Sequence, residues 1–73
     1  MAQERVEVPI TGKIISVNVS QRSVVEEGDT LCLLESMKME NPILAPVGGT
    51  IIEINLSSEQ VVEAGDLVAV IEY

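Results

Sequence analysis

The stretch Pro9–Ser36 reads PITGKIISVNVSQRSVVEEGDTLCLLES, and Pro46–Tyr73 repeats it as PVGGTIIEINLSSEQVVEAGDLVAVIEY at a constant offset of 37 residues without a gap. Twelve of the 28 aligned pairs are identical, and seven of the other 16 exchange one apolar residue for another. Two such copies predict two similar halves related by an approximate two-fold axis. We therefore expect residues 1–73 to form one domain, with halves at about 9–36 and 46–73 and a hairpin at 37–45 between them.

Composition limits what such a domain can do. The single cysteine, Cys32, excludes an internal disulfide and is too little for a zinc site, so the apolar core must supply the stability. A net charge of −8 and a single aromatic residue argue against nucleic acid as a partner. No apolar run is long enough to span a membrane, and the N-terminus does not resemble a signal peptide. The expectation is a cytoplasmic domain, monomeric in isolation and without membrane insertion.

The apolar pattern indicates strands throughout the chain. In the first copy Ile15, Val17 and Val19 alternate with polar residues, and the second copy repeats this period of two. Helical spacing is never sustained for three turns. Eight strands are expected, at Arg5–Val8, Lys13–Val19, Val24–Val25, Thr30–Ser36, Glu40–Leu44, Thr50–Leu56, Val61–Val62 and Leu67–Glu72. Short, evenly spaced strands predict an all-β sandwich or barrel.

Glycines separate these strands. Gly28 and Gly65 each precede an aspartate at equivalent places of the two copies, where a turn can require a positive φ. Gly12 and Gly49 are equivalent as well, and we expect all four glycines to be structural turn residues.

Lys38 is the candidate functional residue. It lies in Glu35-Ser36-Met37-Lys38-Met39-Glu40, and Met37, Lys38 and Met39 fall in the joint, where no repeat partner explains them. Turns favour Gly, Asn, Asp and Ser, so methionines beside a predicted turn are unusual. A lysine at a hairpin tip offers an amine that a modifying enzyme can acylate, and the methionines offer adaptable apolar contacts. The alternative is that both methionines pack in the core, since positions two apart share a strand face.

Other candidates have simpler explanations. Glu35 has a repeat partner in Glu72, so we assign it to presenting the hairpin and not to catalysis. Cys32 lies in an apolar run and is expected to be a buried, inert thiol. The chain has no histidine, so general acid–base catalysis at neutral pH would lack its usual residue. We expect no catalytic residue and no metal site.

The run from Gly28 to Ile43, with Ala45-Pro46 and Gly49-Thr50-Ile51 beyond it, resembles the biotinyl (biotin carboxyl carrier) domain family. The resemblance covers about Val6 to Tyr73, and Met-Lys-Met is its specific motif. It implies a flattened eight-stranded barrel, the barrel-sandwich hybrid, with biotin joined by biotin protein ligase to Lys38 on a hairpin. It also implies that the ligase recognises the hairpin through Glu35, Met37 and Met39, and that these residues help to present Lys38. The domain itself would be non-catalytic, and its biotin would carry a carboxyl group between a biotin carboxylase or decarboxylase and a carboxyltransferase.

Two other functions stay open. Lipoyl domains share the fold and the hairpin lysine, but they typically have an Asp-Lys-Ala-like core. An unmodified structural barrel would need no lysine at the hairpin, and Lys38 with its methionines argues against it. The sequence leaves the parent enzyme and its carboxyl acceptor open.

Overall fold

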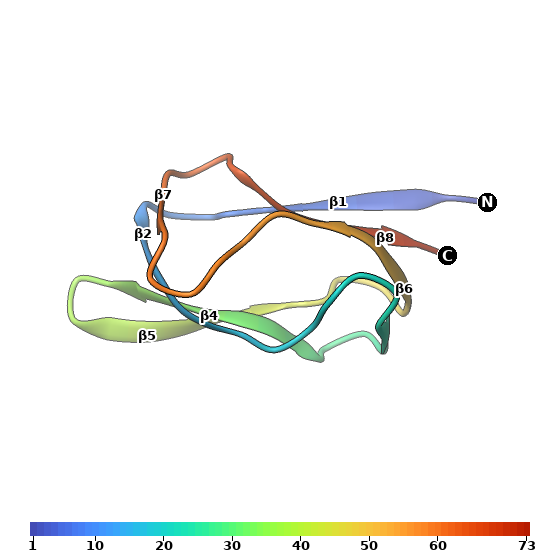
Figure 1. The fold of residues 1–73 in the computed structure, drawn as a ribbon, viewed down its shortest axis with the longest axis horizontal. Helices are drawn as coiled ribbons and strands as arrows, with labels where there is room; N and C mark the ends of the chain where they lie inside the picture. Colours follow the sequence, from blue (N-terminus) through green and yellow to red (C-terminus); the bar gives the residue numbers. More distant parts are fainter.

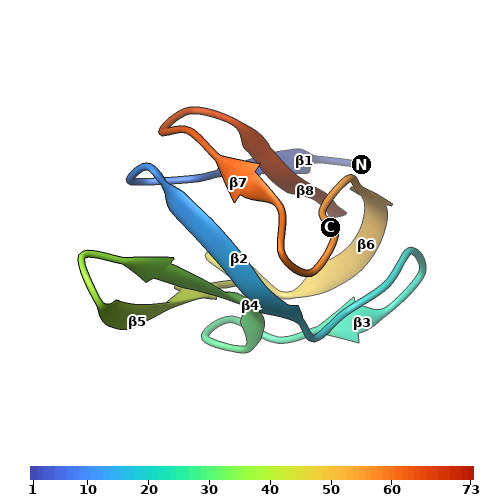
Figure 2. The same cartoon turned by 60° about the vertical axis from the view of Figure 1, so that its left-hand side comes forward.

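The computed structural model describes all 73 residues and contains eight strands and no helix. Their bounds are β1 Gln3–Glu7, β2 Gly12–Val17, β3 Val24–Val25, β4 Thr30–Ser36, β5 Met39–Leu44, β6 Gly49–Ile54, β7 Val61–Val62 and β8 Leu67–Glu72. All pairings are antiparallel, in two four-stranded sheets with the orders β1-β8-β6-β3 and β5-β4-β2-β7 (Figures 1 and 2). The expected all-β barrel-sandwich fold is confirmed.

The two halves repeat each other in register as well as in sequence. Glu35 lies opposite Glu40 in one sheet, and Glu72 lies opposite Gln3 in the other, at the same offset of 37. Gln3 is therefore structurally equivalent to Glu40, although the sequence around Gln3 has no identity with the sequence around Glu40. The two-residue strand of each half belongs to the other half's sheet: β3 of the first half pairs with β6, and β7 of the second half pairs with β2. Both sheets therefore contain strands from the two copies of the repeat.

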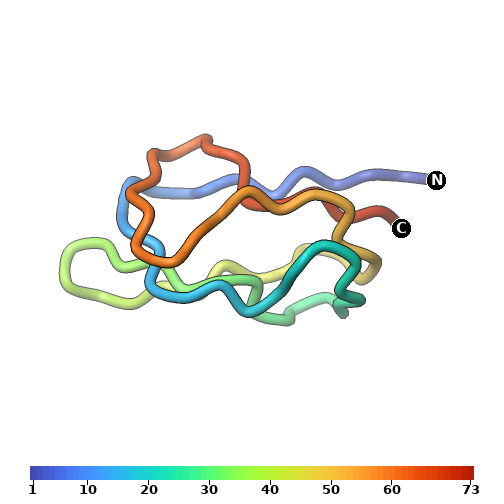
Figure 3. The backbone as a smooth tube through the Cα atoms, in the orientation of Figure 1, coloured from blue at the N-terminus to red at the C-terminus, as the bar shows by residue number.

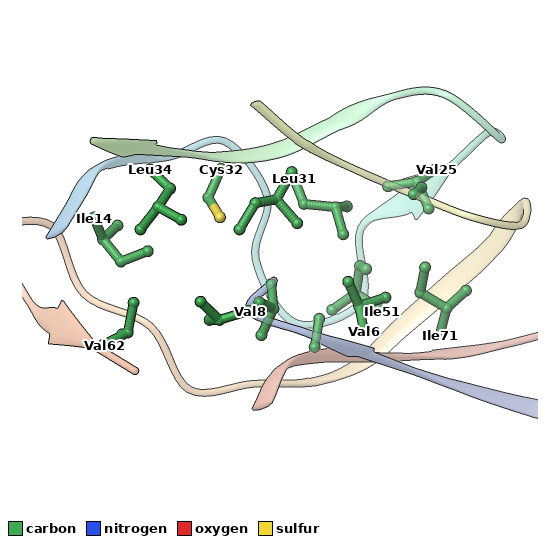
Figure 4. Close-up of a cluster of buried hydrophobic side chains, with 14 residues drawn as sticks. Val6, Val8, Ile14, Val25, Leu31, Cys32, Leu34, Ile51, Val62 and Ile71 are labelled. Carbon is green, nitrogen blue, oxygen red and sulfur yellow. The ribbon is translucent and has the colours of Figure 1, made fainter. Parts of the chain in front are cut away.

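The core lies between the two sheets and is entirely apolar. Fourteen buried side chains form one cluster, and those labelled in Figure 4 point toward one another across the gap between the sheets. No buried side-chain nitrogen or oxygen lacks a partner. Because a domain of this size has few other sources of stability, continuous burial of Val, Ile and Leu is what holds it together.

One detail of the alternation prediction is wrong. The register of β2 shifts between Ile14 and Ser16, so Ile15 is the extra residue of a bulge. Ile14 is fully buried before the bulge, Val17 packs against the core after it, and Ile15 is only half-buried. The same shift occurs in β6 at Ile52. A bulge changes which alternate residues point into the core, and an alternating apolar pattern in the sequence does not reveal where this happens.

Gly28 and Gly65 have the positive φ that a turn demands, at 92° and 95°. In the first turn Asp29 N–H donates to the Glu26 carbonyl at 3.0 Å, which places Gly28 at the third position of a four-residue turn. The Asp29 carboxylate also accepts a hydrogen bond from Glu26 N–H at 2.9 Å. The second turn has the equivalent bonds at Glu63 and Asp66.

Valine at Gly28 or Gly65 is expected to lower the free energy of unfolding by roughly 1–3 kcal/mol. A Cβ at either position would meet no atom within 4 Å, so the effect is backbone strain and not a clash. Gly28→Asn is the matched control, because asparagine tolerates this conformation better than valine does. Urea melts measure the difference. Equal stability of Gly28→Val and wild type would contradict the proposed role of the turn.

The assignment of Gly12 and Gly49 to turns is wrong. Each is the first residue of a strand, β2 or β6, and neither has a positive φ. Glycine is required there for another reason: a Cβ on Gly12 would collide with the carbonyl oxygen of Glu35, and one on Gly49 with that of Glu72. These glycines therefore allow close approach between neighbouring strands.

Candidate functional site

The hairpin between β4 and β5 turns through only two residues, Met37 and Lys38. Ser36 and Met39 close it as the last paired residues of the ladder. Both turn residues have left-handed backbone conformations, with φ of 53° and 66°. Two consecutive positive φ values define a type I′ turn, which matches the twist of a hairpin but normally uses Asn-Gly.

Neither Met37 nor Lys38 favours that conformation. A non-glycine residue in the left-handed region costs of order 1 kcal/mol or more, and such strain persists where the surroundings enforce it. Here the β4·β5 ladder and the two-residue loop length enforce it. Turn formation therefore does not explain why Met and Lys stand at these two positions.

The turn lies at one end of the molecule. The domain measures 37 × 18 × 17 Å, and the hairpin tip forms one end of the long axis, opposite both termini (Figures 1 and 3). By the pseudo-two-fold relation, the pair that closes the hairpin, Ser36 and Met39, corresponds to Tyr73 and Ala2 at the other end, whose backbones exchange two hydrogen bonds.

The methionines are exposed. Met37 is 92% exposed and Met39 66%. Met37 belongs to the turn itself, whereas Met39 is the first residue of β5. The alternative that both pack in the core is therefore wrong. Lys38 is exposed between them and takes part in no ion pair.

Glu35 and Glu40 lie at the base of the hairpin. They are directly opposite each other in β4 and β5, and both are exposed. Like charges facing each other across a strand pair are unfavourable. Lys13 of β2 pairs with Glu35 on its other side, but its amine forms an ion pair with Glu59 and not with Glu35. The sequence singled out Glu35 but not Glu40, whose position opposite it is visible only in the register.

The second lysine has a different setting. Lys13 lies within strand β2, and its Nζ is 3.1 Å from a carboxylate oxygen of Glu59. Such an exposed pair contributes little stability, but it occupies the amine with a counter-ion. Only Lys38 combines a tip position with an unpaired amine.

Asn41 supports the hairpin in a way that sequence reasoning missed. Its side-chain amide donates to the carbonyl of Met39 at 3.2 Å, two residues earlier in β5. This bond braces the strand that leaves the turn. The only signal in the sequence was the place of Asn41 within the family-like run.

Cys32 is fully buried in the core, as expected. Burial raises the pKa of its thiol from 9.0 to about 11, because the charged thiolate loses its hydration. At neutral pH the group is therefore a protonated, apolar side chain without nucleophilic character.

The folded protein is expected to resist thiol-modifying reagents at pH 8 and to react fully once urea unfolds it. Since the folded pKa is the higher one, the neutral thiol stabilises the fold fully below pH 9, and this contribution is lost as the pH rises toward 11. Cys32→Ser is the control for stability across that range. Rapid modification of the folded chain at pH 8 would contradict the assigned burial.

The rest of the surface offers few other sites. The structure has no pocket and no group of three or more His, Cys, Asp or Glu side chains placed to bind a metal ion. It also has no helix with the length and apolar character needed to cross a membrane. What the arrangement provides is an exposed lysine amine that makes no ion pair, flanked by two thioethers, at the tip of a two-residue hairpin. The class of structure defined so far is a two-sheet β sandwich with an exposed lysine at the tip of one hairpin.

Comparisons with known proteins narrow that class. The profile of the Biotin_lipoyl family, described as "Biotin-requiring enzyme", matches residues 4–71. The gamma subunit of methylmalonyl-CoA decarboxylase from Veillonella parvula is 52% identical over 42 residues, which are 58% of this chain and 33% of that subunit. The Biotinylated protein TB7.3 homolog of Mycolicibacterium smegmatis is 50% identical over 42 residues, which are 58% of this chain and 59% of that protein.

A solved structure agrees over nearly the whole chain. Urea carboxylase from Kluyveromyces lactis contains a region that superposes with a TM-score of 0.89 at 33% identity, covering 99% of this chain and 6% of that one. The chain thus spans less than two thirds of each of these relatives. It belongs to the Biotin_lipoyl family, and within it the chain is a biotin carrier domain that performs no catalysis of its own.

Proposed function

We propose that Lys38 is the biotin attachment residue and that the domain serves a biotin-dependent carboxylase, decarboxylase or transcarboxylase. The observation that carries this is the single unpaired lysine on a strained two-residue turn, at the one place where the repeat is broken. The residues present fit the cofactor, because an exposed primary amine is what amide formation with a carboxylic acid requires. Met37 and Met39 flank Lys38, and Glu35 lies at the base of the same hairpin. We propose that biotin protein ligase recognises these three side chains.

The barrel contributes position rather than chemistry. Attached biotin supplies the group that accepts and releases a carboxyl. The β4·β5 ladder holds Lys38 at the end of a rigid body, so the reach of the arm is set by the lysine side chain and its adduct. A tether of this kind makes transfer intramolecular, with an effective concentration fixed by that reach. Two relatives are gamma subunits of decarboxylases, which supports the proposal that this domain carries biotin for a decarboxylase.

The proposed partners are biotin protein ligase, a biotin carboxylase or decarboxylase, and a carboxyltransferase. The surface fits a mobile carrier, because its net charge of −8 opposes self-association and binding to nucleic acid. We therefore propose a monomeric, cytoplasmic domain 1–73 that does not insert into membranes, whose halves 9–36 and 46–73 hold the hairpin 37–45 between them.

The test is the identity of the adduct. The unmodified chain is incubated with biotin protein ligase, biotin and ATP, and in parallel with a lipoate ligase, lipoate and ATP. We expect one biotinyl group per chain in the first reaction and no adduct in the second. A lipoyl adduct formed at the faster rate would assign the chain to the other branch of the family, and no adduct in either would leave an unmodified structural barrel.

A further inference from the structure

The two methionines beside the proposed attachment lysine are exposed thioether side chains. Met37 is nearly fully exposed and Met39 two-thirds exposed. Most methionines of folded proteins lie in cores, where packing shields the thioether. The only thiol of this chain, Cys32, is fully buried and protonated, so it cannot react first with an oxidant.

We propose that Met37 and Met39 are sites of reversible sulfoxidation by hydrogen peroxide and that oxidation blocks biotin loading of Lys38. The inference rests on the proposed function, since it concerns recognition of the same hairpin.

In the reaction a lone pair of the thioether sulfur attacks one peroxide oxygen, and the O–O bond breaks. The sulfur gains one oxygen and is oxidised by two electrons, while the other oxygen leaves as water. A dithiol reductant reverses the step through a methionine sulfoxide reductase, giving thioether, disulfide and water.

Oxidation changes recognition without changing the fold. A sulfoxide is polar and chiral, so a side chain that offered soft apolar contact no longer fits an apolar surface of the ligase. Neither methionine belongs to the core cluster, which means that the added oxygen displaces nothing between the sheets. The expected consequence is a folded chain that accumulates without biotin under oxidative stress and recovers after reduction.

The chain contains its own control methionine. Met1 is 99% exposed, so peroxide reaches it at least as readily, but it lies at the opposite end of the long axis from the hairpin (Figure 1). Oxidation of Met1 tests whether a sulfoxide anywhere on the surface slows the ligase or only one at the hairpin.

The experiment treats the unloaded 73-residue chain with hydrogen peroxide, removes the peroxide, maps sulfoxides by peptide mass spectrometry and measures biotin ligation against an untreated sample. We expect sulfoxides at all three methionines, ligation slowed at least tenfold, an unchanged melting temperature, and recovery with methionine sulfoxide reductases A and B plus dithiothreitol. Met1→Leu should lose ligation on treatment as wild type does. For the Met37→Leu/Met39→Leu variant, the treated and untreated rates should be equal, whatever its basal rate.

Three results would overturn the inference: no sulfoxide at Met37 or Met39, oxidised wild type ligated at the untreated rate, or equal losses in wild type and the double leucine variant. Ligation of the untreated wild type separates this inference from the proposed function. If the untreated chain takes up biotin and oxidation has no effect, only the sulfoxidation proposal fails. If the untreated chain takes up none, the attachment proposal fails and this one fails with it.

Discussion

Lys38→Arg is expected to abolish biotinylation completely and to leave folding unchanged. Arginine keeps the positive charge, but its guanidinium stays protonated and offers no amine for acylation. The side chain is exposed and makes no ion pair, so its replacement should change the free energy of unfolding by less than about 0.5 kcal/mol. Co-expression with biotin protein ligase, followed by a streptavidin blot and a thermal melt, measures both effects.

Lys13→Arg is the matched control for that variant. It removes the only other lysine side chain, the one paired with Glu59, and should leave labelling at the wild-type level. Streptavidin binding by Lys38→Arg, or its loss in a folded Lys13→Arg variant, would contradict the assignment of the attachment site.

Replacing Met37 by Asp and Met39 by Ala is expected to slow biotin ligation strongly while stability hardly changes. An apolar side chain that is fully buried against the ligase contributes about 1.5–3 kcal/mol, so its loss corresponds to a roughly 10- to 100-fold lower kcat/KM. The isolated domain loses little buried area, since both methionines are largely exposed. Aspartate also tolerates the left-handed conformation at position 37 better than methionine does.

Ligase kinetics and thermal melting on the same variants separate recognition from packing. If the methionines were core residues, each truncation would lower stability by about 2–5 kcal/mol, and ligation would fall only because the domain unfolds. Val24→Ala is the matched control, because Val24 is 79% exposed but lies in β3, outside the hairpin. It should alter neither measurement. A large fall in melting temperature for the methionine variant would contradict the recognition role.

The repeat made most of the fold predictable. It located the turns at Gly28 and Gly65, and the alternating apolar pattern located all eight strands to within about two residues at each end. The assignment of strands to sheets could not be predicted, because β3 and β7 are two residues long and cross to the other half. The bulges at Ile15 and Ile52 could not be predicted either. In an apolar pair such as Ile14-Ile15, the sequence does not indicate which residue points into the core.

Sequence reasoning could single out the residues of the proposed site but not their backbone conformation. Met37, Lys38 and Met39 stood out because the repeat has no counterpart for them. Their chemistry alone does not predict left-handed backbone at Met37 and Lys38, which arises from the two-residue loop and the register of the ladder. The same holds for Arg22 and Glu59, equivalent loop residues with φ of 78° and 74° that carry no turn-forming signature. Tertiary pairing enforces these conformations against local preference.

The most direct test of the account is tandem mass spectrometry of this chain isolated from its native cells, with every lysine-containing peptide mapped. Sequence, fold and family together predict a biotinyl group on Lys38 and an unmodified Lys13. A lipoyl group on Lys38, biotin on Lys13, or a Lys38 that is always unmodified would contradict it.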